Sequence, residues 1–242
     1  MKSILVKKIL DSERALTDRE LVLSLKGGEV YTFLNPVSYL DALKREELFG
    51  QFDGIYADGS ILVAAIYAIY GKKVTRRSCD MTSIGRALLE LSAKEGKTIY
   101  YVASKQEEVE LAVMMFRKRF TGVNICGYRN GYFANEDEMD EEAKHIVEAN
   151  PDFLVVGMGA IKQDEFLLRV KRAGFRGVGF TCGGFVHQTA NNKTEYYPQW
   201  IDRMNLRYLY RMYKEPYTRK RYFIGGLKFP LCFLWDRFFR RK

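Results

Sequence analysis

Short apolar runs that are typical of β-strands alternate with longer runs of helical spacing along most of this chain. The strand-like runs cover residues 30–34, 54–56, 98–103, 123–126, 153–156 and 177–180. The helix-like runs cover residues 38–47, 61–70, 82–95, 107–120, 135–149 and 163–173. Strands that alternate with helices of this length predict an α/β fold, with a mostly parallel sheet covered by helices on both faces.

A sheet of this kind also predicts where a ligand would lie. Ligands of open parallel sheets bind beyond the carboxyl ends of the strands. The loops that we expect at that edge contain Asn35, Asp58, Gly127, Gly159 and Gly183. These loops are therefore the first places to look for a site.

The excess positive charge of the chain is confined to its C-terminal end. The formal net charge of the 242 residues is +9, and residues 203–242 contain 12 Lys or Arg against two acids. Apolar aromatic residues lie among these cations: Phe229, Phe233, Trp235, Phe238 and Phe239. Cations interleaved with aromatic rings suit a surface that has phosphates above hydrocarbon. We therefore expect a domain of residues 1–195, followed by a basic, aromatic, helical appendage of residues 196–242 that associates with a membrane surface.

Several other classes of protein are disfavoured. No apolar run reaches the ~18 residues that a membrane span needs. The four cysteines are scattered without a CxxC pair, the chain has two histidines, and no Asp-x-Asp segment is present. We therefore expect no disulfide, no metal and no cofactor. A non-catalytic module whose basic tail binds nucleic acid is the rival interpretation, but phosphate binding alone does not require the aromatic residues of the tail.

Asp58 has two chemical interpretations. It stands in a short turn, Ala57-Asp58-Gly59-Ser60, between a strand and an apolar helix. One interpretation is a helix N-cap, whose carboxylate accepts hydrogen bonds from backbone amides. The other is a general base at the edge of the sheet. The two conflict, because capping stabilises the ionised carboxylate and weakens the base.

Two glycine-containing turns could contact phosphate, and one residue pair could be a nucleophile. Residues 157–164 follow a buried strand and open a helix, so that helix amides and Lys162 could hold a phosphate or a sugar hydroxyl. A tight structural turn is the simpler interpretation there, and again at residues 181–184. His187 lies near Cys182 in the sequence, but no third group that would orient a Cys–His pair is identifiable.

Several segments together resemble a known family. They are Thr32-Phe33-Leu34-Asn35-Pro36, Tyr56-Ala57-Asp58-Gly59, Gly127-Tyr128-Arg129-Asn130-Gly131-Tyr132-Phe133, residues 151–163 and residues 200–222. Their order and spacing resemble those of the WecG/TagA/CpsF family of bacterial glycosyltransferases, over about residues 20–225. Each motif is short, but the combination is specific.

The resemblance implies a fold and an activity. It implies a Rossmann-like catalytic domain at the cytoplasmic face of the cell membrane, bound there peripherally. The implied reaction is an inverting, metal-independent transfer of a sugar from a UDP-sugar to a polyprenyl-diphosphate-linked sugar, in the synthesis of cell-surface polysaccharide. N-acetylhexosamines such as N-acetylmannosamine are among the implied donors. Closure of the site by the tail or by a second copy of the chain, as a homo-oligomer, is a further expectation.

The resemblance also assigns roles to individual residues. Asp58 matches the proposed base of the family. The implied donor-side residues are Thr32, Asn35, Gly159, Lys162, Gln163, Gly183 and an arginine that is either Arg76 or Arg77. The implied contacts to the lipid diphosphate are Arg211, Arg219 and Arg221.

The sequence departs from the family pattern at several positions. Tyr56 replaces the usual Asn, Ile161 the usual Pro and Asp164 the usual Glu, while Val186 stands where many members have Asp. These differences bear on the identity of the donor sugar more than on the type of reaction.

Overall fold

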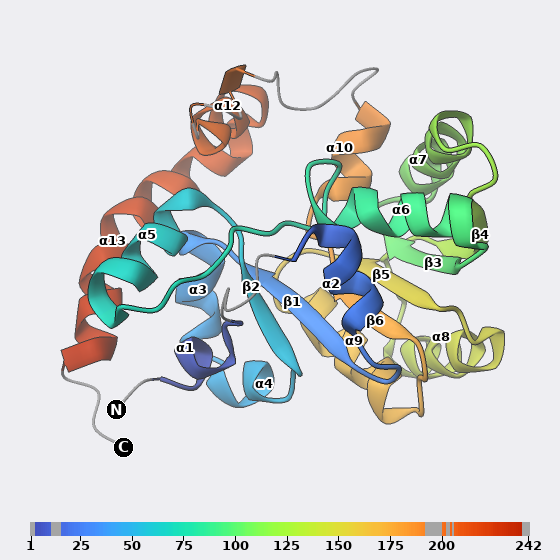
Figure 1. The fold of residues 1–242 in the computed structure, drawn as a ribbon, viewed down its shortest axis with the longest axis horizontal. Helices are drawn as coiled ribbons and strands as arrows, with labels where there is room; N and C mark the ends of the chain where they lie inside the picture. The colour runs from blue at the N-terminus through green and yellow to red at the C-terminus, as the bar shows by residue number, and fades with distance from the viewer. Residues whose placement is uncertain (1–2, 11–15, 192–199, 202–203, 205, 239–242) are drawn as a thin grey trace.

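The molecule is built around one sheet, as Figure 1 shows for the computed structural model, which describes residues 3–10, 16–191, 200–201, 204 and 206–238. The strands are β1 (Val30–Leu34), β2 (Gly54–Ala57), β3 (Thr98–Ala103), β4 (Asn124–Arg129), β5 (Phe153–Gly157) and β6 (Val178–Thr181). Their order is β2-β1-β6-β5-β3-β4, and every pairing among them is parallel. The predicted α/β fold is confirmed.

Helices cover both faces of the sheet because the strands carry apolar side chains on both. Tyr100 and Val102 of β3 belong to one buried cluster, whereas Ile99, Tyr101 and Ala103 belong to the other. The first face is covered by α1 (Ile4–Lys8), α3 (Pro36–Ala42), α4 (Glu46–Gly50), α5 (Ser60–Tyr70), α8 (Glu136–Ala149), α9 (Lys162–Arg172) and α13 (Arg219–Phe238). The second is covered by α2 (Asp18–Ser24), α6 (Ile84–Glu95), α7 (Gln106–Arg119) and α10 (Phe185–Asn191).

The region predicted as one helix over residues 38–47 is two helices. Asn35 caps α3 and Pro36 occupies its first turn, which starts the helix earlier than expected. Arg45 then has a non-helical backbone (φ −134°, ψ 38°), so that α4 begins anew at Glu46. The short helices α1, α2 and α10 had no periodic pattern long enough to predict them.

The C-terminal helix is part of the core of the molecule. The rings of Phe229 and Phe233 lie 5.9 and 5.2 Å from the ring of Tyr39 in α3. Asp236 is 2% exposed and accepts hydrogen bonds from the hydroxyls of Tyr39 and Tyr70. The expectation that Phe229 and Phe233 face a membrane is therefore wrong, because these rings complete the hydrophobic cluster under α3 and α5.

The remaining parts of the C-terminal segment are α12 (Arg207–Lys214) and the short 3-10 helix η1 (Pro216–Thr218). The expected boundary between residues 195 and 196 lies outside the described residues, as does Phe239. Within the part of the chain that the structure describes, no helix combines the length and the apolar character that crossing a membrane would require.

Candidate active site

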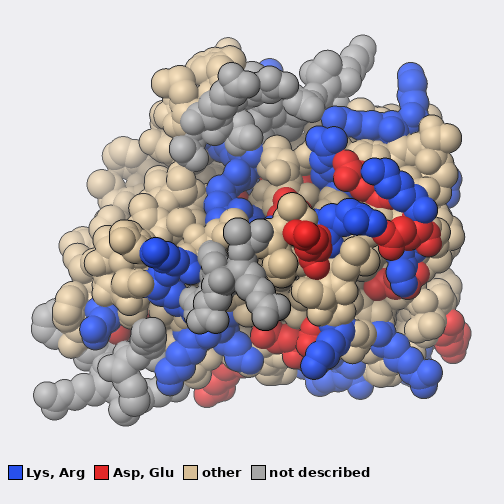
Figure 2. Space-filling view, viewed as in Figure 1, with Lys and Arg blue, Asp and Glu red and all other residues tan. Residues whose placement is uncertain are grey.

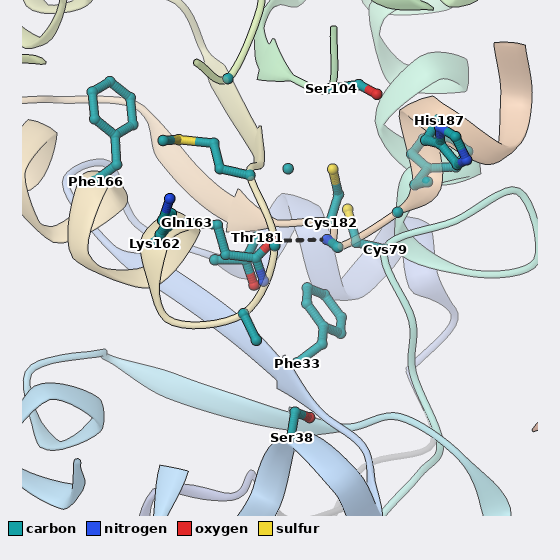
Figure 3. Close-up of a pocket in the computed structure, with 18 of the residues that line it drawn as sticks. Phe33, Ser38, Cys79, Ser104, Lys162, Gln163, Phe166, Thr181, Cys182 and His187 are labelled. Atoms are coloured by element: carbon teal, nitrogen blue, oxygen red, sulfur yellow. Dashed lines mark hydrogen bonds between the residues drawn. The ribbon is translucent and has the colours of Figure 1, made fainter. Parts of the chain in front are cut away.

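A cavity of about 1330 Å³ opens at the carboxyl ends of the strands. Its wall includes residues that directly follow five strands: Asn35 after β1, Asp58 after β2, Ser104 after β3, Met158 after β5 and Cys182 after β6. Figure 3 is a close-up of residues that line the cavity, among them Ser104 and Cys182. Gly127 does not lie in a loop, since β4 continues to Arg129, and Gly131 and Tyr132 line the cavity instead.

Asp58 lies in the wall of this cavity and does not cap the helix that follows it. Gly59, with φ +96°, is the N-cap residue of α5, and no side chain caps this end. The backbone N–H of Asp58 donates to the carbonyl oxygen of Leu34, which ties the turn to β1. Burial, followed by the nearby charge of Asp80, raises the pKa of Asp58 to about 6. The capping interpretation is wrong, and the carboxylate is a stronger base than an exposed one.

Three arginines lie near Asp58, and two of them belong to the C-terminal segment. The Arg76 Nε lies 4.0 Å from the Asp58 Oδ1. Arg207 and Arg211 of α12 act on the same carboxylate, and like Arg76 they lower its pKa against the effect of burial. Arg211 lines the cavity, and Arg207 pairs with Asp80 at 3.2 Å. A positively charged rim therefore lies beside the carboxylate.

Arg77 lies on the other side of the backbone from Arg76. Its guanidinium pairs with Asp18 of α2 and donates to the carbonyl oxygen of Leu16 at 2.6 Å. Arg77 is 7% exposed and is not among the described residues that line the cavity. Arg76 is not among them either, but it lies 4.0 Å from Asp58, which does line the cavity, so the geometry favours Arg76 as the arginine nearer to a ligand.

The loop after β5 forms the floor of the cavity with two residues in the left-handed region. Gly159 has φ +83°, and Ile161 has φ +72° with ψ −55°. A proline ring holds φ near −65°, so a proline at position 161 could not form this turn. The loop delivers Gln163, whose Oε1 accepts a hydrogen bond from the backbone N–H of Gly183 at 3.1 Å (Figure 3). Gly159, Lys162, Gln163 and Gly183 thus lie together at the cavity.

A buried polar network supports this loop from below. The Thr32 hydroxyl donates to the Asp164 Oδ1 at 2.7 Å and lies 2.8 Å from the Thr181 hydroxyl. The Asp164 Oδ2 accepts from the backbone N–H of Ile161 at 3.0 Å, which holds the left-handed residue in place. Thr32 is 1% exposed and does not line the cavity. Its observed contacts position the loop.

The other expected contact residues divide into two groups. Asn35, Arg211 and Arg221 line the cavity, although the Asn35 Oδ1 already accepts hydrogen bonds from the N–H groups of Val37 and Ser38 at 3.0 Å. Only the amide nitrogen of Asn35 could therefore serve a ligand. Arg219 is exposed, does not line the cavity and donates to the carbonyl oxygen of Met212 at 2.8 Å.

A second titratable pair lies at the far end of the cavity. His187 Nδ1 lies 2.8 Å from the Glu108 Oε1, and both residues line the cavity. Burial raises the pKa of Cys182 to about 12, so that its thiol stays protonated and a Cys–His nucleophile does not form. The sequence did not point to Glu108, since only the fold brings it to His187. Among the residues with a described placement, no group of three or more His, Cys, Asp or Glu could hold a metal ion.

Comparison with known proteins shows the family to which the chain belongs. The model of the Glycosyl transferase WecG/TagA/CpsF family matches residues 8–242. The chain belongs to this family. Family membership confirms the expected glycosyltransferase over a non-catalytic nucleic-acid-binding module.

Three characterised WecG/TagA/CpsF relatives illustrate the range of the family. A UDP-Gal:alpha-D-GlcNAc-diphosphoundecaprenol beta-1,4-galactosyltransferase of Shigella boydii is 33% identical over 230 residues, which cover 95% of this chain and 93% of the relative. An N-acetylglucosaminyldiphosphoundecaprenol N-acetyl-beta-D-mannosaminyltransferase of Bacillus subtilis (strain 168) is 26% identical, covering 81% of this chain and 75% of the relative. The enzyme of the same description from Staphylococcus aureus (strain NCTC 8325 / PS 47) is 25% identical over 68% of this chain and 63% of the relative.

Proposed function

We propose that this enzyme transfers a hexose or N-acetylhexosamine from a UDP-sugar to the sugar of a polyprenyl-diphosphate-linked acceptor, with inversion at the anomeric carbon and without a metal. The single observation that carries the proposal is Asp58, a carboxylate with a raised pKa in the wall of the large cavity at the strand ends. The names of the relatives support a UDP-sugar donor and an acceptor on diphosphoundecaprenol.

Asp58 acts as the general base in this reaction. Its carboxylate takes the proton of an acceptor hydroxyl as that oxygen attacks the anomeric carbon from the face opposite UDP. The new C–O bond forms as the bond to the UDP oxygen breaks, and UDP leaves with the electron pair. A base with a pKa of about 6 is largely ionised at neutral pH, yet is more basic than an ordinary aspartate.

The leaving diphosphate is stabilised by cations and backbone amides. Arg76 and Arg211 supply positive charge beside Asp58, and Gly159 and Lys162, at the start of α9, line the same cavity and offer backbone amides to the diphosphate. Such preorganised donors stabilise charge that develops in a transition state. Arg221, on the α13 side of the cavity, contacts the lipid diphosphate, whereas Arg219 has no place in the cavity.

The acceptor reaches this site from a membrane surface on which α13 lies peripherally, at the cytoplasmic face. The outer side of α13 presents exposed apolar residues at helical spacing: Phe223, Leu227, Leu231 and Phe238. Lys220 and Lys228 are exposed on the same helix. Apolar residues flanked by cations are typical of helices that lie in a bilayer interface.

The test is UDP release by the purified full-length protein. The acceptor is GlcNAc-diphosphate on a short, water-soluble prenyl chain, and the donors are UDP-galactose, UDP-glucose, UDP-N-acetylglucosamine and UDP-N-acetylmannosamine. We expect one donor to release UDP only when the acceptor is present, to yield a product of inverted configuration by NMR, and to remain active in a chelator. UDP release that ignores the acceptor, or a retained configuration, would contradict the proposal.

A further inference from the structure

Helix α5 has an apolar outer face that the core does not use. Its sequence, Ser-Ile-Leu-Val-Ala-Ala-Ile-Tyr-Ala-Ile-Tyr, contains no charged residue. Leu62 and Ile66 are fully buried, yet Ile61 is 46% and Tyr67 is 58% exposed. A helix at a water-facing surface normally carries polar residues on its outer side. The outer side of α5 therefore requires an explanation that the core does not supply.

Helix α5 packs against α13 through Tyr70, which contacts Phe233 on the buried side of α13. The Tyr70 ring packs edge-on against the Phe233 ring at a centroid distance of 5.5 Å, and the Arg237 guanidinium lies 5.6 Å from the centre of the Tyr70 ring. Tyr67 lies one helical turn before Tyr70 and on the outward side of this contact. Figure 1 shows α5 and α13 side by side, and Figure 2 shows a largely uncharged surface over them.

Most exposed charges around the two helices are positive, although Arg221 of α13 pairs with Asp41 of α3 at 2.9 Å. No acid occurs between Asp58 and Asp80, and the one acid of α13, Asp236, is buried. The exposed charges near the two helices are cations such as Lys73, Lys220 and Lys228. A face that is apolar at its centre and cationic at its border complements an anionic lipid surface.

We propose that α5 and α13 together form one lipid-binding face, in which Ile61 and Tyr67 of α5 insert beside Phe223, Leu227 and Leu231 of α13. The proposal rests on the proposed function in one respect, since a lipid-linked acceptor gives the enzyme a reason to lie on a membrane. It extends that function, because α5 belongs to the expected catalytic domain and begins two residues after Asp58. A docked α5 holds the catalytic carboxylate at the level where the acceptor diphosphate meets the lipid headgroups.

The experiment compares two double variants of the full-length chain. Ile61→Gln/Tyr67→Gln changes the α5 face, and the control Leu111→Gln/Met114→Gln changes exposed apolar residues of α7, which are 39% and 59% exposed. Binding is measured by flotation with vesicles of phosphatidylcholine that contain phosphatidylglycerol. Because insertion of apolar area is worth about 25 cal/mol per Å², we expect the α5 variant to bind at least about tenfold more weakly and the control to bind as the parent does.

Two further measurements separate the possible results. UDP release with the water-soluble acceptor should be the same for the parent and both variants. If none of the three proteins released UDP, the proposed function would be refuted, but the comparison of vesicle binding would still be valid. Equal vesicle binding by the α5 variant and its control would overturn the lipid-binding face. The second measurement is sedimentation velocity. If the parent formed an oligomer and the α5 variant did not, the lipid-binding face would also be overturned, because the face would then be a contact between two copies of the chain.

Discussion

Asp58 shows how burial produces a base from an ordinary side chain. An unperturbed aspartate has a pKa of 3.8, and at this position burial raises it to about 6 in spite of Arg76, Arg207 and Arg211. The sequence placed Asp58 in a strand-to-helix turn and left capping and catalysis as alternatives. Only the structure separates them, because Gly59 takes the capping position and leaves the carboxylate to the cavity.

Replacement of the base tests this assignment. Asp58→Asn keeps the shape of the side chain but cannot accept a proton, and general-base assistance contributes roughly 10² to 10⁴ in rate. We expect the turnover number to fall by that factor, with the affinity for UDP nearly unchanged in isothermal titration calorimetry. An unchanged turnover number would remove Asp58 from the mechanism.

The pH dependence of the reaction follows from the same pKa. Protonation of Asp58 removes the base, so kcat/KM should be constant at neutral pH and fall about tenfold per pH unit below about 6. The acid limb is to be measured with the water-soluble acceptor. A limb centred near 4, the range of an exposed aspartate, would show that burial does not tune this carboxylate.

Asp164 should affect stability rather than the acid limb. Burial raises its pKa from 3.8 to about 6, so between these values the folded chain holds protons that the unfolded chain has released. The free energy of unfolding should therefore decrease as pH rises through this window. In Asp164→Asn this decrease should be shallower than in the parent in urea titrations at several pH values. An unaltered slope would contradict the raised pKa of Asp164.

The residues of that network also mark where sequence reasoning stops. The resemblance to the family singled out Thr32 as a donor contact, whereas the structure buries it against Asp164 and Thr181. Thr32 and Asp164 are 132 positions apart in the chain. No local pattern encodes a hydrogen bond over such a separation, so the contact becomes visible only when α9 packs against β1.

At the level of helices and strands, the sequence predicts the sheet well and the C-terminal helix only in part. Apart from the edge strand β4, which is only partly buried, each strand is a short, mostly buried run, and burial on both faces makes such runs easy to recognise. In α13 the aromatic residues look alike in sequence, but Phe229 and Phe233 face Tyr39 whereas Phe223 and Phe238 face outward. The hydrophobicity of a helix does not by itself say which partner each face has.

A pair of substitutions tests the two faces of α13. Phe233 is 1% exposed and Leu231 is 71% exposed. Phe233→Ala should lower the free energy of unfolding by about 3–5 kcal/mol, because it leaves a cavity in the core. Leu231→Ala should change it by less than about 0.5 kcal/mol. The free energy of unfolding of both variants is to be measured by urea titration. Equal decreases in the two variants would contradict the packing of α13 described above.

For the whole molecule, the expected division at residue 196 makes the tail a separable unit, and a truncation that removes α13 tests this expectation. A chain that ends at Thr218 lacks α13 and exposes the apolar side chains of α3 and α5 that Phe229 and Phe233 cover. We expect this truncated chain to unfold at a clearly lower urea concentration than the full chain. If both chains unfolded at the same urea concentration, the tail would be an appendage on which the stability of the rest does not depend.

The inward anchoring of Phe229 and Phe233 has a practical consequence for crystallographers. Truncation of an apolar terminus is one way to avoid detergent, but here truncation would remove two rings of the hydrophobic core and destabilise the protein. Polar replacements limited to Phe223, Leu227 and Leu231 change only outward-facing positions. These variants should stay in solution without detergent and keep an intact active site that can be crystallised with a bound nucleotide.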